Sequence, residues 1–166
     1  TLTISGTPTS AAGSPYSFSI STTGNACAVA NANGTITVSS DHAINLTSGN
    51  SNQSACVNTA ITDITYTLSG GATGATVTGL PPGVTFSVTG TILTITGTPT
   101  TTVGSPFNFT INTTGNTCIT ASSNGSITVT PAHSLSLTSG NPSQTVCINN
   151  AIGNINYTLG GGATNA

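Results

Sequence analysis

The sequence contains no lysine and no arginine, and its only acidic side chains are those of Asp41 and Asp63. Phosphate backbones are bound mainly by Lys and Arg, so this absence excludes nucleic acid as a partner. Attraction to an anionic membrane surface needs the same cations and is excluded by the same argument. Two carboxylates cannot form the acidic clusters of calcium-binding modules. No run approaches the roughly 20 apolar residues of a membrane-spanning helix, so membrane insertion of this chain is not expected.

Most of the chain is neutral and polar, with 36 threonines and 20 glycines among its 166 residues. Low charge and few aromatic residues are typical of disordered polar tracts. Here, however, apolar and polar residues alternate over short runs between Gly, Pro and Asn turn residues, which is the pattern of half-buried strands. Because no segment shows a helical period, the chain is predicted to be all-β.

The chain also repeats itself. GSPYSFSISTTGNAC (13–27) returns as GSPFNFTINTTGNTC (104–118), and a shift of 91 residues aligns 1–75 with 92–166 without a gap. In this alignment 43 of the 75 pairs are identical. Solenoid repeats are usually about 20–50 residues long, so the longer period indicates an array of small domains. A period of this length suits one β-sandwich.

Seven short strands are predicted in the middle of the chain, at 43–47, 61–68, 75–80, 84–89, 92–96, 107–111 and 126–130. A loop rich in Ser, Gly and Asn is expected between the first two, and Asn124-Gly125 is expected to form the turn before the last. Alternation places Val84, Phe86 and Val88 on one strand face. Short strands separated by frequent turns predict tandem immunoglobulin-like Greek-key sandwiches.

This interpretation divides the chain into three parts. Residues 41–131 form one complete repeat, 1–40 form the C-terminal half of a preceding repeat, and 132–166 form the N-terminal half of the following one. Half of a sandwich cannot bury its own apolar face. Residues outside the chain are therefore expected to complete each end.

The middle of the chain carries several linked motifs. In order these are the corner Leu80, Pro81, Pro82 and Gly83, then Gly97, Thr98 and Pro99, then Gly104, and a strand with Phe107 and Phe109. This segment resembles the immunoglobulin- and cadherin-like repeats of bacterial surface proteins. The stretch QTVCINNAIGNINYTLGGGAT (144–164) is similar to tandem repeats in giant adhesins of gliding Bacteroidetes, which are exported by type IX secretion. The resemblance implies a surface-exposed, extracellular, multi-repeat adhesin or stalk. The sequence itself contains no constellation of residues that carries chemistry, so no catalytic role and no cofactor are expected.

Each period contains two cysteines, and none of them belongs to a Cys-x-x-Cys pair, so a zinc ribbon or a thioredoxin-type site is not indicated. An exported domain favours disulfides. Cys56–Cys118 would close the central repeat, leaving Cys27 and Cys147 to neighbouring repeats outside the chain. Alternatively, Cys27–Cys56 and Cys118–Cys147 would join each repeat to its neighbour. The first pairing is favoured because closing a loop of 62 residues restricts the unfolded chain by about 4 kcal/mol.

Asp41-His42 is the one dipeptide that suggests catalysis, beside the many serines of the chain. Adjacent strand residues point to opposite faces, no nucleophile elbow is present, and Ala132 replaces Asp41 one period later. The dipeptide is therefore expected to be an exposed part of a linker. His42 and His133 recur once per period, but no second ligand lies near either in the sequence, so no metal site is predicted.

The leading functional hypothesis is a structural stalk or fibre whose partners are neighbouring repeats or copies of itself. The alternative is a filament subunit in which residues 1–40 of one copy complete residues 132–166 of another by strand exchange. One feature counts against this alternative, because such a composite repeat would lack the equivalent of 76–91, the Leu-Pro-Pro-Gly corner and its strand. A carbohydrate-binding module is a third hypothesis, although the chain has no Trp for an exposed sugar platform. Uncharged sheet edges would also permit lateral contacts between fibres.

Overall fold

The computed structural model describes residues 1–166 and contains twelve β-strands and no helix, which confirms the predicted all-β class. The strands are β1 (Tyr16–Ser21), β2 (Asn31–Ile36), β3 (His42–Ser48), β4 (Asn52–Cys56), β5 (Ile64–Gly70), β6 (Ala72–Thr78), β7 (Val84–Thr89), β8 (Ile92–Gly97), β9 (Phe107–Gly115), β10 (Ser122–Thr130), β11 (Ser134–Ser139) and β12 (Asn156–Gly160). No helix of the length and apolar character that a membrane crossing requires is present.

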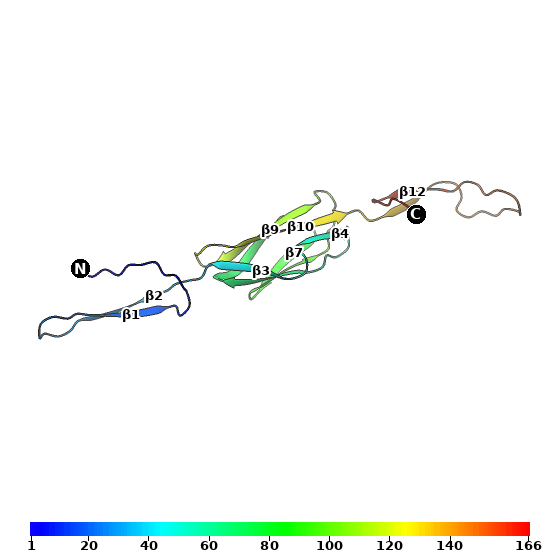
Figure 1. Ribbon diagram of the computed structural model, residues 1–166. Helices are drawn as coiled ribbons and strands as arrows, with labels where there is room; N and C mark the ends of the chain where they lie inside the picture. The colour runs from blue at the N-terminus through cyan, green and yellow to red at the C-terminus, as the bar shows by residue number, and fades with distance from the viewer.

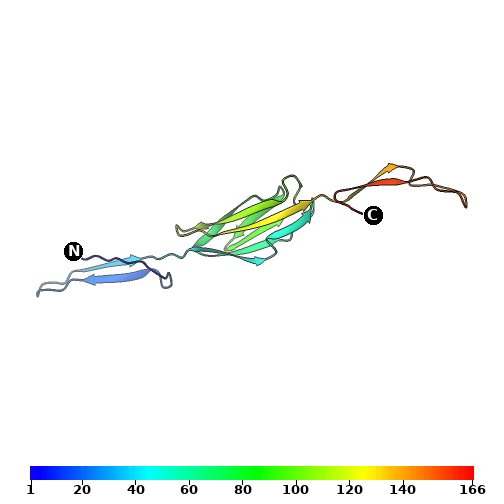
Figure 2. The ribbon, with the colours of Figure 1, turned by 45° about the horizontal axis from the view of Figure 1, so that its top comes forward.

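The strands form three bodies that lie one after another along the molecule (Figure 1). Strands β3 to β10 make a central body, which we call the central unit (41–131). The hairpins β1–β2 and β11–β12 are separate two-stranded sheets. We call the segments that contain them the N-terminal half-unit (1–40) and the C-terminal half-unit (132–166). Figure 2, a second view, also places the two half-units at opposite ends of the central unit.

The central unit consists of two four-stranded sheets. One sheet has the order β3-β5-β8-β7 and the other has the order β4-β10-β9-β6. Every pairing is antiparallel except that between β4 and β10, which is parallel and places Cys56 beside Thr130. Strands β6 and β7 are edge strands, one in each sheet.

The two sheets share one apolar core. Its ten buried residues are Ile61, Ile64, Tyr66, Val84, Leu93, Ile95, Phe109, Ile111, Ile127 and Val129, which come from both sheets and from the segment before β5. Successive side chains of a strand point to opposite faces, and Ile64, Tyr66 and Leu68 are buried at every second position of β5, as the alternation predicts. The central unit is thus sandwich-like, with its core between the sheets.

Three local predictions differ from the structure. Strand β4 lies in a segment that the sequence predicts to be a loop. The loop is predicted because the side chains of this segment are mostly polar. Asn124-Gly125 lies inside β10 rather than at a turn, with Gly125 opposite Phe109 on β9. Phe86 is 39% exposed although Val84 on the same strand is buried, because β7 is an edge strand whose side chains are covered incompletely.

The half-units use the strand register of the central unit. Tyr16 pairs with Ile36 as Phe107 pairs with Ile127, and every other β1–β2 pair also has its β9–β10 counterpart 91 residues later. The β11–β12 pairs correspond in the same way to β3–β5 pairs, including the register shift. The sequence period is therefore accompanied by matching strand pairings.

Candidate functional site

The segment that connects the N-terminal half-unit to the central unit lies directly against one end of the sandwich. We call this end, formed by the β9–β10 connection and the start of β3, the N-terminal pole. Two backbone hydrogen bonds hold the segment there: His42 N donates to Ile119 O (2.9 Å), and Gly71 N donates to Asp41 O (3.1 Å). Within the pole, Asn116 N also donates to Gly71 O at 3.2 Å. Asp41 Oδ1 also accepts a hydrogen bond from Ile119 N at 3.2 Å. The connecting segment is thus attached to the sandwich by paired backbone groups.

His42 is the centre of this attachment, and it is 7% exposed. Its Nδ1 lies 2.9 Å from Thr113 Oγ1, and its Nε2 lies 3.1 Å from Asn116 Oδ1. Thr113 Oγ1 is also paired with the backbone of Ala121, since it lies 3.0 Å from Ala121 O and accepts a hydrogen bond from Ala121 N at 2.8 Å. The expectation of an exposed Asp41-His42 dipeptide is therefore wrong for the histidine, because residues more than 70 positions away in the chain cover it.

Asn116 links the imidazole to the connecting segment. Its amide nitrogen donates to Ser40 O at 3.0 Å, while its oxygen accepts from Cys118 N at 3.0 Å. These two contacts fix the orientation of the amide. Gly71 lies against the same groups, and a Cβ there would overlap both Asn116 and Ser40 O. Close packing at the pole therefore requires a glycine at position 71.

The opposite end of the sandwich, which we call the C-terminal pole, is formed where β4 and β10 end together. Val57 N donates to Thr130 O at 2.9 Å, and Asn58 N donates to Pro99 O at 2.8 Å. Thr130 Oγ1 also lies 3.9 Å from Cys56 Sγ. The chain leaves the central unit at this pole and continues into the C-terminal half-unit (Figure 1).

The structure places the cysteines of the central unit at its two different poles. Cys118 lies at the N-terminal pole, with Sγ 3.6 Å from Ser39 O, and Cys56 lies at the C-terminal pole. Strand β10, which connects the poles, has nine residues and is roughly 26 Å long. A disulfide needs Cα atoms within about 7 Å. The expected Cys56–Cys118 pairing does not fit this arrangement.

The alternative pairings do not fit either. Cys27 lies in the connection between β1 and β2, and Cys147 lies in the connection between β11 and β12. Both connections point away from the central unit (Figure 1), so Cys27 is remote from Cys56 and Cys147 is remote from Cys118. All four cysteines are free thiols in this structure.

Most of the glycines and prolines of the motifs named from the sequence lie in the connections between strands, and Gly97 is the last residue of β8. Val84 N donates to Pro81 O at 3.0 Å and closes the turn between β6 and β7. Gly83 adopts a φ of 89° and Gly104 a φ of 95°, values that favour glycine. The remaining motif residues follow the same pattern, with Leu80 and Pro82 in the β6–β7 corner and Gly97 and Pro99 at the end of β8.

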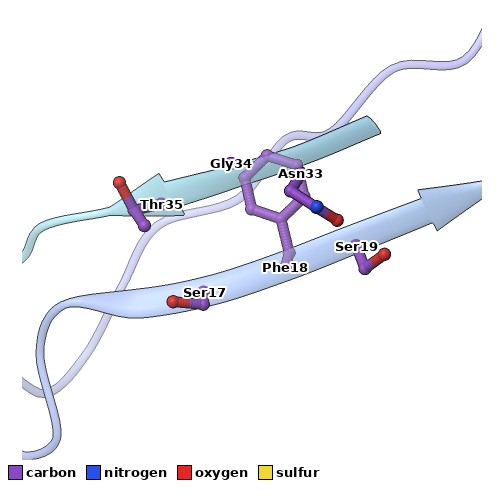
Figure 3. A pocket seen from close by; sticks show the side chains of 6 residues that line it. All are labelled: Ser17, Phe18, Ser19, Asn33, Gly34 and Thr35. Carbon is purple, nitrogen blue, oxygen red and sulfur yellow. The ribbon is translucent and has the colours of Figure 1, made fainter. Parts of the chain in front are cut away.

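The half-units expose faces that the central unit buries. Figure 3 shows an open hollow on the N-terminal half-unit, lined by Ser17, Phe18, Ser19, Asn33, Gly34 and Thr35, where the Phe18 ring lies over Gly34. The equivalent ring in the central unit, that of Phe109, is 1% exposed because the second sheet covers it. The hollow is therefore an uncovered inner face of the hairpin.

Sequence inspection missed Thr113 and Asn116 as the partners of His42. Both belong to the stretch TTGNTC, which has a near-identical counterpart, TTGNAC, 91 residues earlier. Cys27 N donates to Asn25 Oδ1 at 3.1 Å, as Cys118 N donates to Asn116 Oδ1. The identity of these polar positions in both copies was the available signal.

No protein-family model matches the chain, and no curated protein is significantly similar to it. No cluster of three or more His, Cys, Asp or Glu side chains is arranged to hold a metal ion. The two poles and the uncovered faces of the half-units are therefore the features of the molecule that bear on its function.

Proposed function

We propose that the chain is an extracellular structural repeat protein, the stalk or fibre region of a bacterial cell-surface adhesin. Its units would be tandem immunoglobulin-like Greek-key sandwiches with a period of 91 residues. The strand orders support the immunoglobulin-like assignment, because β3-β5-β8-β7 corresponds to the A-B-E-D sheet. In the same way, β10-β9-β6 corresponds to the G-F-C sheet, with β4 as an added parallel edge.

The observation that carries the proposal is the recurrence of central-unit contacts in both half-units. Gln144 makes two side-chain bonds to the backbone of Gly153 (2.9 and 2.6 Å), as Gln53 does to Thr62 (2.7 and 3.0 Å). In the N-terminal half-unit, Val38 N donates to a serine hydroxyl at 2.8 Å, and Val129 N does the same one period later. Each half-unit thus has the local structure of one part of the central unit.

The exposed apolar side chains of the half-units support a tandem array. Leu2 is 69% exposed and Tyr157 is 48% exposed, whereas their equivalents Leu93 and Tyr66 are at most 1% exposed. Burying such side chains contributes about 1.5–3 kcal/mol each. In a tandem array the flanking repeats supply the missing halves, so these side chains are buried and stabilise every unit.

Reach would be the function of such an array. By strand-length arithmetic each unit adds roughly 30–40 Å. The contacts of Asn116 with Ser40 and of Cys118 with Ser39 would restrict bending where units meet. A surface with no Lys or Arg and two acids gives side-by-side contacts that depend weakly on salt. These properties suit a stalk that carries a binding tip away from the cell.

The mass of the native polypeptide on a reducing, denaturing gel tests the proposal. A tandem array predicts a single chain of several hundred kilodaltons, because many periods must be joined covalently. A band near the 16.1 kDa of this chain would overturn the stalk proposal, because the half-units would then need completion between separate molecules.

The filament subunit is the second candidate, although one feature counts against it. A composite of residues 132–166 and 1–40 of another copy would lack the equivalents of 76–91, which hold β7 and the second half of β6. Both are edge strands. The composite would therefore keep the inner strands of both sheets, and the 16.1 kDa band would be its signature.

A further inference from the structure

The two cysteines of the central unit lie against residues that are equivalent under the 91-residue period. Cys56 Sγ lies 3.9 Å from Thr130 Oγ1 at the C-terminal pole. Cys118 Sγ lies 3.6 Å from the carbonyl oxygen of Ser39, which enters the N-terminal pole. Ser39 precedes Thr130 by 91 positions. Thr130 is the last residue of β10, and Ser39 comes shortly after the end of β2, which is the equivalent strand. The same position of the repeat therefore contacts the sulfur of Cys56 at the C-terminal pole and the sulfur of Cys118 at the N-terminal pole.

This equivalence shows which cysteines meet where two units join. In a preceding unit, Ser39 would take the place that Thr130 has in the central unit, so that unit's counterpart of Cys56 would lie beside Ser39. Neighbouring strands are about 4.8 Å apart. Cys118 reaches the same Ser39 from the other side of the junction. A cysteine of the Cys56 type and a cysteine of the Cys118 type from the next unit thus flank a single residue.

We propose that each junction between consecutive units is closed by a disulfide between these two cysteines. Cys56 would bond to the Cys118 counterpart of the following unit, and Cys118 would bond to the Cys56 counterpart of the preceding unit. The inference depends on the proposed arrangement of consecutive units and names its covalent contact. It differs from both pairings considered from the sequence, because it joins neither two cysteines of one unit nor two that lie 29 residues apart in this chain.

The bond requires an oxidant that carries a disulfide, such as oxidised glutathione or an extracytoplasmic thiol oxidase. The thiolate of one cysteine attacks the oxidant's disulfide, forms a mixed disulfide and releases one thiol. The thiolate of the second cysteine then attacks the mixed disulfide and releases the second thiol. Two cysteine thiols lose two electrons and two protons, and the oxidant's disulfide gains both as two thiols.

The bond would act on the mechanics of the junction. The connecting segment is one covalent path between units, and it is held by the contacts of Asn116 with Ser40 and of Cys118 with Ser39. A disulfide from the β9–β10 connection of one unit to the end of β4 in the preceding unit adds a second covalent path. Two connections at separate points prevent bending about the first.

Disulfide mapping of the native protein tests the inference. The protein is isolated without reductant, its thiols are blocked with iodoacetamide, and it is digested with pepsin at low pH so that exchange is suppressed. We expect the peptide of Cys56 to be linked to a Cys118-type peptide that is not the one from Cys118 itself. A link between Cys56 and Cys118, or alkylated thiols at both, would overturn the inference.

Two variants of the recombinant chain give a second measurement. One keeps Cys27 and Cys56 (Cys118→Ser and Cys147→Ser), and the other keeps Cys56 and Cys118 (Cys27→Ser and Cys147→Ser). With oxidised glutathione, neither is expected to form a disulfide within one chain, and mass spectrometry should find glutathione adducts instead. An intrachain Cys56–Cys118 or Cys27–Cys56 bond contradicts the inference.

The outcomes separate this inference from the proposed function. In a filament of copies, the same geometry brings Cys56 to Cys27 and Cys147 to Cys118 of the next molecule. A ladder of disulfide-linked chains that collapses on reduction to 16.1 kDa would overturn the stalk and support the junction disulfide. One long chain whose disulfides lie inside single units would support the stalk and overturn the junction disulfide.

Discussion

Gly125 lies directly opposite Phe109 in the register between β10 and β9, and a Cβ at this glycine would overlap the aromatic ring and the carbonyl oxygen of Ser51. The ring is buried at 1% exposure, so it has no free space to move into. Gly125→Ala should therefore lower the free energy of unfolding by about 2–3 kcal/mol. Urea denaturation of the chain measures the change. Gly24→Ala is the control, because nothing lies within 4 Å of a Cβ there, and equal effects of both variants would contradict the argument.

The same pair shows why part of the fold could not be predicted. Asn-Gly is a strong turn signal, and the glycine inside β10 is explained only by contacts across the fold, with the Phe109 ring and the Ser51 carbonyl oxygen. Strand β4 could not be predicted because its sequence is polar. One of its polar side chains, that of Gln53, makes long-range hydrogen bonds to the backbone of Thr62. By contrast, strand β8 follows its alternation closely, with Leu93 and Ile95 buried, because the apolar face decides its register.

The candidate site was less accessible from the sequence than the fold. His42 is buried by Thr113 and Asn116, which lie 71 and 74 positions further along the chain. Local patterns carry no information about contacts at such separations. The positions of Cys56 and Cys118 likewise follow from the parallel pairing of β4 with β10, which places Cys56 at the far end from the β9–β10 connection.

Replacement of His42 tests whether the contacts at the N-terminal pole stabilise the folded chain. His42→Ala removes two hydrogen bonds and leaves polar atoms of Thr113 and Asn116 without their partner, so we expect a loss of about 2 kcal/mol in unfolding free energy. His133→Ala is the matched control, since His133 is exposed. The two variants are compared by urea denaturation, and a neutral His42→Ala would show that the contact adds no stability.

The Tyr66 hydroxyl offers a test in the opposite direction. This side chain is 1% exposed, and its hydroxyl has no hydrogen-bond partner among the protein atoms. An unpaired buried hydroxyl costs about 1–3 kcal/mol, so Tyr66→Phe should leave stability unchanged or raise it by about 1 kcal/mol. Tyr157→Phe, at a 48% exposed side chain, should have no effect. Thermal unfolding of both variants gives the comparison, and a clear loss of stability in Tyr66→Phe would mean that the hydroxyl is paired.

Gly71 provides a test of stiffness where the half-unit meets the central unit. A valine there would overlap Ser40 O and the Asn116 amide, so Gly71→Val should displace the connecting segment from the pole. NMR relaxation should then show that the N-terminal half-unit tumbles more independently of the central unit. Thr117→Val, at an exposed position of the same connection, is the control. If relaxation is unchanged in Gly71→Val, these contacts do not determine the stiffness of the junction.

Leu2 tests whether the uncovered faces recognise each other. Its equivalent in the central unit, Leu93, is fully buried in β8 beside the β5 strand, whose counterpart lies in the C-terminal half-unit. The half-units of two copies therefore carry complementary apolar surfaces, and the purified chain should associate with increasing concentration in sedimentation velocity. Leu2→Asp places a charge in that interface and should weaken association at least tenfold, which corresponds to about 1.4 kcal/mol.

The matched control for this experiment is Val103→Asp. Val103 is 82% exposed in the central unit and lies outside the core, so the added charge is the same while the complementary face is untouched. If both variants associate like the natural chain, the half-units do not complete one another, and only flanking repeats of the same polypeptide remain to cover them. If Leu2→Asp alone stays monomeric, the surface that closes a unit within an array is also able to join separate molecules.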